Sequence, residues 1–206
     1  MPNLTPLVLL LLAYVLGATP TSYWVGKRFF GVDLRTKGSG NLGATNTFRI
    51  LGWKAAVPVV IIDVLKGLVP VAFFPQYDHS AAWAWTLAYA AAAIFGHVFS
   101  FWVGFKGGKG IAASAGAFLG LSPWGVLIAL AAWLVATFST RMVSVGSLSA
   151  AVALPVSLLF VPHEGGRTLL YFTIALAVFV FWAHRSNIRR ILKGEENRFG
   201  RKKAGS

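Results

Sequence analysis

The residues best suited to chemistry lie in one polar stretch, 38–46, which reads GSGNLGATN. Gly38, Gly40 and Gly43 permit positive φ angles and let the backbone come close to a ligand. Short hydrogen-bonding side chains lie between and after them, at Ser39, Asn41, Thr45 and Asn46. Such a loop can direct several N–H groups at one anion, and the nearby cations Arg35, Lys37 and Arg49 favour phosphate. The alternative is an ordinary membrane loop whose small polar residues form turns.

A second stretch, 96–110, reads GHVFSFWVGFKGGKG and ends in a glycine-rich cationic turn. The turn does not match the motif of a nucleotide-binding P-loop, because Val103 stands where the first glycine belongs and Gly110 replaces the Ser/Thr. What remains is a turn that opens a helix and suits phosphate without a metal, made of Lys106, Gly107, Gly108 and Lys109. A basic turn that only fixes membrane topology is the alternative.

The third stretch, HRSNIRR at 184–190, follows the last apolar segment. If it is helical, the i, i+3 spacing puts His184 and Asn187 on one face near the membrane surface. The basic tail around them also fits a plain interfacial anchor.

Other catalytic patterns are missing from the sequence. It has no Cys, which excludes thiolate nucleophiles, iron–sulfur clusters and Cys-based zinc sites. It contains no HExxH motif and no paired carboxylates, so carboxylate acid–base chemistry has little support. We therefore expect neither a metal nor another cofactor.

These stretches must be positioned by membrane-spanning helices. The chain has 206 residues, of which 56 % are hydrophobic and 12 % charged, and its mean hydropathy is +0.67. This composition indicates an integral membrane protein. The net charge of +13 arises from cations between and after apolar segments, which favours membrane orientation and anionic head groups or substrates over nucleic acid.

We expect an all-α polytopic protein with seven transmembrane helices in a single domain, 1–206. The expected spans cover residues 4–26, 55–74, 81–102, 110–121, 123–138, 142–161 and 168–183. A break at Ser122-Pro123 makes two helices of 110–138, and all but two of the 19 cations then lie on one side. That side is the cytoplasm, with loop 27–54 and the tail 184–206, and the N-terminus is outside. The exceptions are Lys66, inside the second span, and Arg167, in a connection.

Three details of the sequence carry further expectations. The segment 110–121 is too short to cross a bilayer core of ~30 Å, so it is either a partial span or begins earlier. Asp63 and Lys66 lie three residues apart within the second span, where they can neutralise each other or, alternatively, form a proton or ion path. The pairs Gly104/Gly108 and Gly116/Gly120 have the spacing of close helix contacts.

Taken together, GSGNLGATN at 38–46, GHVFSFWVGFKGGKG at 96–110 and HRSNIRR at 184–190 resemble the signature motifs of the bacterial acyl-phosphate-dependent glycerol-3-phosphate acyltransferases, the PlsY family. The resemblance extends to DVLKG at 63–67 and SVGS at 144–147, which adds Ser147 to the candidates for substrate binding. One departure is Ser100, where the family usually has Pro.

The resemblance implies an enzyme of phospholipid biosynthesis in the bacterial cytoplasmic (inner) membrane. It would move a fatty acyl group from acyl phosphate to the 1-hydroxyl of sn-glycerol 3-phosphate, giving lysophosphatidate and phosphate at a site facing the cytoplasm. Its partners would be these two substrates and membrane lipids, without nucleic acid, and the protein would be a monomer. An acyl phosphate is already activated, so no cofactor is required.

We expect direct transfer without a covalent acyl-enzyme. Amides of residues 40–43 with Ser39, Asn41 and Thr45 would hold the donor phosphate, helped by Gly38 and Asn46. Arg49, Lys109, His184 and Asn187 would clamp glycerol 3-phosphate. This arrangement requires residues 38–46 and 104–110 to lie close together on one side of the membrane. The proton would pass to a substrate phosphate oxygen or, alternatively, to His184 as general base. A transporter or channel for a phosphate-bearing anion is the alternative function.

Overall fold

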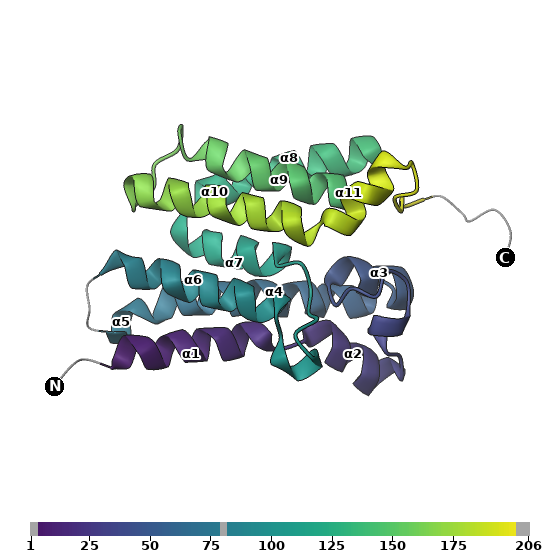
Figure 1. Cartoon of the computed structure of the whole chain (residues 1–206), viewed down its shortest axis with the longest axis horizontal. Coiled ribbons are helices and arrows are strands. Elements are labelled where there is room, and N and C mark those ends of the chain that lie inside the picture. The colour runs from purple at the N-terminus through teal and green to yellow at the C-terminus, as the bar shows by residue number, and fades with distance from the viewer. Residues whose placement is uncertain (1–3, 79–81, 201–206) are drawn as a thin grey trace, which may run out of the picture. The chain divides into compact units, whose positions relative to one another are not determined.

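The computed structural model describes residues 4–78 and 82–200, and the regular structure within these ranges is helical throughout (Figure 1). The chain forms two compact units, one ending at Leu121 and the other beginning at Ser122. The expected all-α class is confirmed for the described residues.

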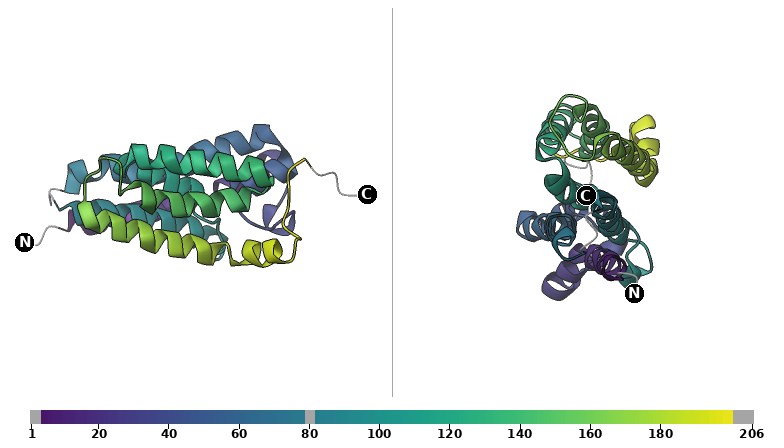
Figure 2. Two further views of the ribbon diagram at one scale, coloured as in Figure 1. Left: turned by 90° about the horizontal axis from the view of Figure 1, so that it is seen from above. Right: turned by 90° about the vertical axis from the view of Figure 1, so that its left-hand side faces the viewer.

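The N-terminal unit contains α1 to α7 and two short 3-10 helices, η1 and η2 (Figures 1 and 2). Their bounds are α1 Thr5–Ala18, α2 Thr21–Phe30, η1 Leu34–Thr36, α3 Ala44–Leu51, α4 Trp53–Phe73, α5 Pro75–Asp78, α6 Trp83–Val98, η2 Phe101–Val103 and α7 Ile111–Leu121. Two helix pairs organise this unit, because α1 packs against α6 and α4 packs against α7.

The first apolar segment is not the single helix expected over 4–26. It is bent by 42° between α1 and α2. Pro20 explains the correction, because the residue before a proline avoids the helical region, and Thr19 has φ −53° and ψ 111°. The break leaves Thr19 and Thr21 available to a neighbouring helix.

Glycines allow the helices of this unit to approach one another closely. A methyl group added at Gly67 of α4 would overlap the carbonyl oxygen of Ala113, and one added at Gly116 of α7 would overlap that of Val64. The predicted contact at Gly116 and Gly120 is therefore confirmed, with α4 as the partner.

The same spacing at Gly104 and Gly108 gave a wrong prediction. Gly104 has φ +65° and lies in the turn after η2, so these two glycines are not on a helix. Their place is in the loop that leads to α7.

The C-terminal unit contains α8 Pro123–Thr140, α9 Val143–Ser157, α10 Gly166–Ala183 and α11 Arg185–Leu192. Within it α9 packs against both α8 and α10. The predicted break at Ser122-Pro123 is confirmed, since α7 ends at Leu121 and Pro123 begins α8. Arg167 lies in the first turn of α10 and not in a connection as expected.

Four stretches in the described residues are long and apolar enough to cross a membrane: Trp53–Asp78, Trp83–Val103, Pro123–Thr140 and Gly166–Ala183. The bent pair α1 and α2 makes a fifth if counted as one span. The shortness of the 110–121 segment is confirmed, because α7 has only 11 residues, and α9 is also short with 15. The count of seven spans and their orientation stay predictions.

Candidate active site

The loop before α3 is shaped by the side chain of Asn46. Its Oδ1 accepts a hydrogen bond of 2.9 Å from Ser39 N, and its Nδ2 donates to Leu34 O at 3.3 Å and to Lys37 O at 3.1 Å. Only 1 % of Asn46 is exposed. Its hydrogen bonds go to the protein, so Asn46 fixes the loop in the structure, and direct contact with a ligand stays a prediction.

The backbone of this loop leaves some amides for a ligand. Gly40 N donates to Lys37 O at 3.0 Å, and Gly40 has φ +70°, which suits glycine. In the described part of the chain, the N–H groups of Leu42, Gly43 and Ala44 have no acceptor. They lie at the N-terminus of α3, where helix geometry leaves amides unpaired and favours an anion.

The candidate side chains of this loop lie on exposed or half-buried positions. Ser39 and Asn41 belong to the loop itself, and a hydrogen bond of 3.5 Å joins Asn41 N to Ser39 Oγ. Thr45 and Arg49 are both exposed and lie one turn apart on α3, since i, i+4 residues share a helix face. One short segment, 39–49, thus carries hydroxyl, amide and guanidinium groups on exposed or half-buried side chains.

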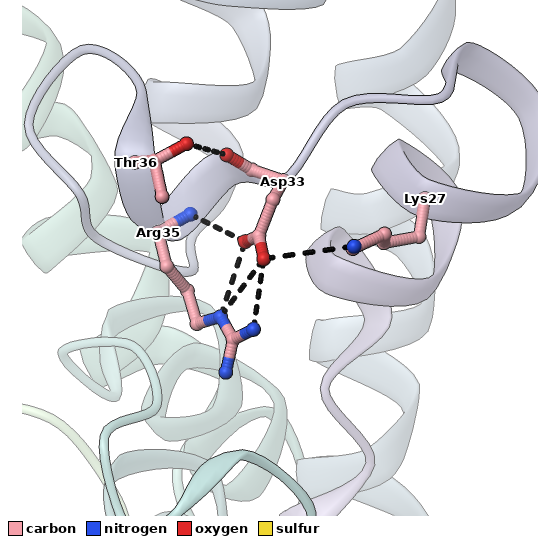
Figure 3. A network of polar contacts seen from close by, with 4 residues as sticks. All are labelled: Lys27, Asp33, Arg35 and Thr36. Carbon is pink, nitrogen blue, oxygen red and sulfur yellow. Dashed lines mark hydrogen bonds and ion pairs between the residues drawn. The ribbon is translucent and has the colours of Figure 1, made fainter.

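The entry to the loop is held by a charged network around Asp33 (Figure 3). Arg35 Nη2 lies 2.8 Å from Asp33 Oδ2, Lys27 Nζ lies 3.8 Å from the same oxygen, and Thr36 Oγ1 donates to Asp33 O at 3.0 Å. Hydrogen bonds from Arg35 lower the pKa of the Asp33 carboxyl to about 2. The Arg35 guanidinium also lies 4.7 Å from the Tyr23 ring centroid. Of the flanking cations, Arg35 is therefore part of the loop's own structure.

The second glycine-rich turn is tied back to the end of α6. Gly107 N donates to Val98 O at 2.9 Å, and Gly108 N donates to His97 O at 3.1 Å. These bonds satisfy carbonyls that the helix end leaves unpaired. Substrate contact by the Gly107 and Gly108 backbone stays a prediction, and both amides hold the turn in this structure. Lys106 is exposed and Lys109 half-buried just before α7.

The two glycine-rich loops lie against each other in the N-terminal unit. A methyl group added at Gly108 would lie 2.8 Å from Leu42 O and would overlap the His97 ring. Leu42 also packs with Val103 and Leu34 in one buried cluster. The sequence-derived expectation that 38–46 and 104–110 lie close together agrees with these contacts.

The C-terminal unit holds the other candidate residues. His184 lies between α10 and α11, and its Nδ1 is 2.9 Å from Val180 O. A carbonyl oxygen can only accept, so Nδ1 carries a proton in this contact. Ser147 is on α9 and donates to Val143 O at 3.0 Å. The meeting of His184, Asn187 and Ser147 with the loops of the other unit stays a prediction.

Glu196 is a residue that the sequence reasoning missed. Its Oε1 accepts from Asn187 Nδ2 at 2.7 Å and from Ser144 Oγ at 2.9 Å, and its Oε2 accepts from Arg190 Nε at 2.8 Å. The signal available in the sequence was an acidic residue in an otherwise basic tail, nine positions after Asn187. Glu196 orients Asn187 and fastens the tail to α9 and α11.

Fold and site together define a class: a helical membrane protein in which two neighbouring glycine-rich turns, the N-terminus of α3 and several cations lie in one unit. In the described residues, no group of three or more His, Cys, Asp or Glu could hold a metal ion.

Comparison with known proteins identifies the family within this class. The family model for glycerol-3-phosphate acyltransferase matches residues 7–194. The glycerol-3-phosphate acyltransferase of Geobacter sulfurreducens is 45 % identical over 197 residues, covering 95 % of this chain and 98 % of the relative. That of Fusobacterium nucleatum is 41 % identical over 190 residues, covering 92 % and 96 %.

Solved structures agree with this match. The crystal structure of PlsY (YgiH), an integral membrane glycerol 3-phosphate acyltransferase, in its glycerol 3-phosphate form has a TM-score of 0.85, 35 % identity and coverage of 95 % and 96 %. Its lysophosphatidic acid form has a TM-score of 0.84, 34 % identity and coverage of 95 % for both chains. The chain belongs to the glycerol-3-phosphate acyltransferase family of PlsY, integral membrane proteins of phospholipid biosynthesis. The family match favours acyl transfer over the transporter alternative.

Proposed function

We propose that the protein transfers a fatty acyl group from acyl phosphate to the 1-hydroxyl of sn-glycerol 3-phosphate. The alcohol oxygen attacks the acyl carbon, the new ester bond forms, and the bond from that carbon to the phosphate oxygen breaks. Lysophosphatidate and inorganic phosphate leave. Acyl phosphate is a mixed anhydride with a good leaving group, so the reaction requires no thiol and no nucleotide, in keeping with a sequence without Cys.

The observation that carries this proposal is the approach of the two glycine-rich loops, with Leu42 O beside Gly108. One loop ends at the unpaired amides of α3, and the other carries Lys106 and Lys109. Two neighbouring phosphate positions are what a reaction between two phosphate-bearing substrates requires. Holding the reactants in line can contribute several orders of magnitude to the rate.

On the donor side, the amides of residues 42–44 with Ser39, Asn41 and Thr45 bind the acyl phosphate and the charge that develops on it as it leaves. Gly38, Gly40, Gly43 and Asn46 give this loop its shape. On the acceptor side, Arg49, Lys109, His184 and Asn187 bind glycerol 3-phosphate, with Lys106, Gly107, Gly108 and Ser147 around them.

The hydroxyl proton goes to an oxygen of the donor phosphate, which becomes more basic as the bond to carbon breaks. His184 is the competing base, because an imidazole is the side chain that most often accepts a proton in general base catalysis. Activity of His184→Gln at saturating substrates separates the two routes. Retention of most of the wild-type kcat favours the phosphate as base, and a loss of about 100-fold or more favours His184.

The setting of the proposed reaction is the cytoplasmic membrane of a bacterium, with the site facing the cytoplasm. The whole chain acts as one catalytic domain and as a monomer, crossing the membrane seven times. Support comes from the cations of loop 27–54 and of the tail, which favour the cytoplasmic side for both.

The direct test is purified protein with acyl phosphate and glycerol 3-phosphate in the presence of a chelator. We expect equal amounts of inorganic phosphate and lysophosphatidate. Ser39→Ala and Arg49→Ala should each lower kcat/KM by at least about tenfold, whereas Thr168→Ala, an exposed hydroxyl in the first turn of α10, should leave it unchanged.

Three results contradict the proposal. Product formation from an acyl thioester but not from acyl phosphate would overturn the donor. Normal kcat/KM in both Ser39→Ala and Arg49→Ala would overturn the phosphate site, and uptake of glycerol 3-phosphate into sealed vesicles without a donor would point to transport.

A further inference from the structure

A buried ion pair in α4 has no part in the proposed reaction. Lys66 Nζ lies 2.8 Å from Asp63 Oδ1, and the side chains are 5 % and 2 % exposed. Within an apolar span, each such ion is unfavourable unless it is paired. Mutual pairing offsets part of this cost, and the remaining hydrogen-bonding capacity of both groups must be satisfied nearby.

The pair is connected to the break between α1 and α2. Thr21 Oγ1 donates to Asp63 Oδ1 at 3.0 Å, and Lys66 Nζ donates to Thr19 O at 2.8 Å. Ser100 Oγ, beyond the end of α6, donates to Ala18 O at the same break. The bend that Pro20 imposes is thus fastened to α4 and to the segment after α6.

His97 lies between this ion pair and the second glycine-rich turn, residues 106–109. Its Nδ1 is 3.8 Å from Asp63 Oδ1 and makes no hydrogen bond to any residue that the structure describes, although His97 is only 6 % exposed. Its Nε2 faces the opposite way, against Gly108, where even a methyl group would overlap the ring. The backbone carbonyl of His97 accepts from Gly108 N at 3.1 Å.

We propose that His97 is a positioning residue for the glycine-rich turn, held in place by the Asp63–Lys66 pair. The pair lies against the Nδ1 side of the ring, 3.8 Å from Asp63 Oδ1, and the Nε2 side supports Gly108 and, through it, Lys109 and the start of α7. This proposal rests on the function above, because it assumes that the turn binds the phosphate of glycerol 3-phosphate. Nothing in it gives His97 contact with the reacting atoms.

The inference predicts a change in binding more than in turnover. A turn that has lost its support holds the substrate phosphate less well in the ground state and the transition state alike. When binding weakens equally in the ground state and the transition state, KM rises and kcat stays nearly unchanged. We expect His97→Ala to raise KM for glycerol 3-phosphate about tenfold, with kcat within about threefold of wild type.

Substitutions that retain one end of the ring make the test sharper. Gln places its amide near the position of Nε2, so His97→Gln should restore KM to within about threefold of wild type. Asn places its amide near Nδ1, so His97→Asn should resemble His97→Ala. The pair variant Asp63→Asn/Lys66→Met should also raise KM, and its effect should not add to that of His97→Ala, because the two act on one turn.

Tyr89→Phe is the matched control. Tyr89 is also buried in α6, and its hydroxyl donates to Asp78 Oδ2 at 3.0 Å, away from the turn. Removing this bond should lower the melting temperature and leave both KM values unchanged. An equal rise of KM in Tyr89→Phe would mean that any buried polar loss in α6 has this effect, and the proposal would be wrong.

Calorimetric titration with glycerol 3-phosphate alone gives Kd without turnover and separates the two proposals. If wild type binds glycerol 3-phosphate but makes no product from acyl phosphate, the proposed donor fails while a weaker Kd for His97→Ala still supports positioning. If wild type is active but His97→Ala has normal KM and Kd, or if His97→Gln is no better than His97→Ala, the positioning role is overturned.

Discussion

At the scale of single residues, the polar side chains near the glycine-rich loops divide according to the partners they already have. The side chains of Asn46 and Arg35 already form hydrogen bonds within the loop and its entry, whereas Ser39 and Thr45 are exposed. The first pair shapes the loop, and we propose that the second pair contacts the substrate. Residue type alone does not separate these roles, because amides and guanidinium groups serve both.

Glu196 should matter for activity through Asn187. It accepts hydrogen bonds from Asn187, Ser144 and Arg190, and bonds to a charged group contribute about 1.5–3 kcal/mol each. We expect Glu196→Ala to lower kcat/KM by at least about tenfold and to lower the melting temperature. Steady-state kinetics and thermal unfolding in detergent measure the two effects.

Glu195→Ala is the matched control for this prediction, because it makes the same change of charge at the exposed neighbouring position. Its kcat/KM should equal that of wild type. Equal losses in both variants would show that the tail charge, and not the contact with Asn187, is what the activity requires.

At the scale of elements, the contact between α4 and α7 should tolerate a methyl group at one glycine and not at another. At Gly116 the added carbon would overlap the carbonyl oxygen of Val64, which is backbone and cannot turn away. At Gly120 it would lie 2.7 Å from Val71 Cγ1, a side-chain methyl group whose displacement disturbs the helix less than displacement of a backbone carbonyl. Gly116→Ala should therefore lower the melting temperature strongly and Gly120→Ala only slightly.

Thermal unfolding of the two variants in the same detergent tests this contrast, since both lose a glycine from the same helix. The helix propensity of Ala favours each substitution by up to about 1 kcal/mol, so packing alone must produce the loss at Gly116. A Gly116→Ala protein as stable as Gly120→Ala would show that α4 and α7 can separate at little cost.

The segment that enters the candidate site should lose stability in acid through Asp33. Its carboxyl has a pKa lowered from 3.8 to about 2, chiefly by hydrogen bonds from Arg35. A carboxyl whose pKa is lower in the folded state than in the unfolded state stabilises the fold at pH values above the unfolded-state pKa. This contribution is therefore present at pH 5 and is lost as the pH falls from about 4 to about 2.

Melting temperature measured from pH 5 to pH 2 checks this expectation. Wild type should lose stability more steeply below pH 4 than Asp33→Asn, which has no carboxyl to protonate. Arg35→Gln should flatten the profile in the same way, because it removes the main cause of the pKa shift. Parallel profiles for all three proteins would contradict the role of this pair.

At the scale of the whole molecule, the sequence predicted the helical class, the break at Ser122-Pro123 and the closeness of the two glycine-rich loops. The helical class follows from the length of the apolar segments, and the break follows from Pro123. The closeness of the two loops follows from the phosphate groups that both expected substrates carry. It did not predict the bend at Pro20, because proline occurs inside helices as well, as Pro58 does in α4. Glu196 was missed because its role depends on which donors the fold brings to it.

The number of membrane crossings can be tested with single cysteines, because the natural sequence contains no Cys. Loop 27–54 and the tail are separated by an even number of crossings if α7 and α8 are separate spans, and by an odd number if they form one. Single cysteines at the exposed positions Lys37, Glu164 and Lys193 report these sides. With seven spans, a charged maleimide applied to intact cells should label Glu164→Cys alone.

Permeabilised cells provide the control, because all three cysteines should then react. Labelling of Lys193→Cys but not Lys37→Cys in intact cells would place the tail outside and join α7 with α8 as one crossing. It would also separate the tail from loop 27–54 and so remove His184 and Asn187 from the proposed phosphate site. The eight cations from Arg185 onward argue against that arrangement, because moving them across the membrane opposes the positive-inside tendency.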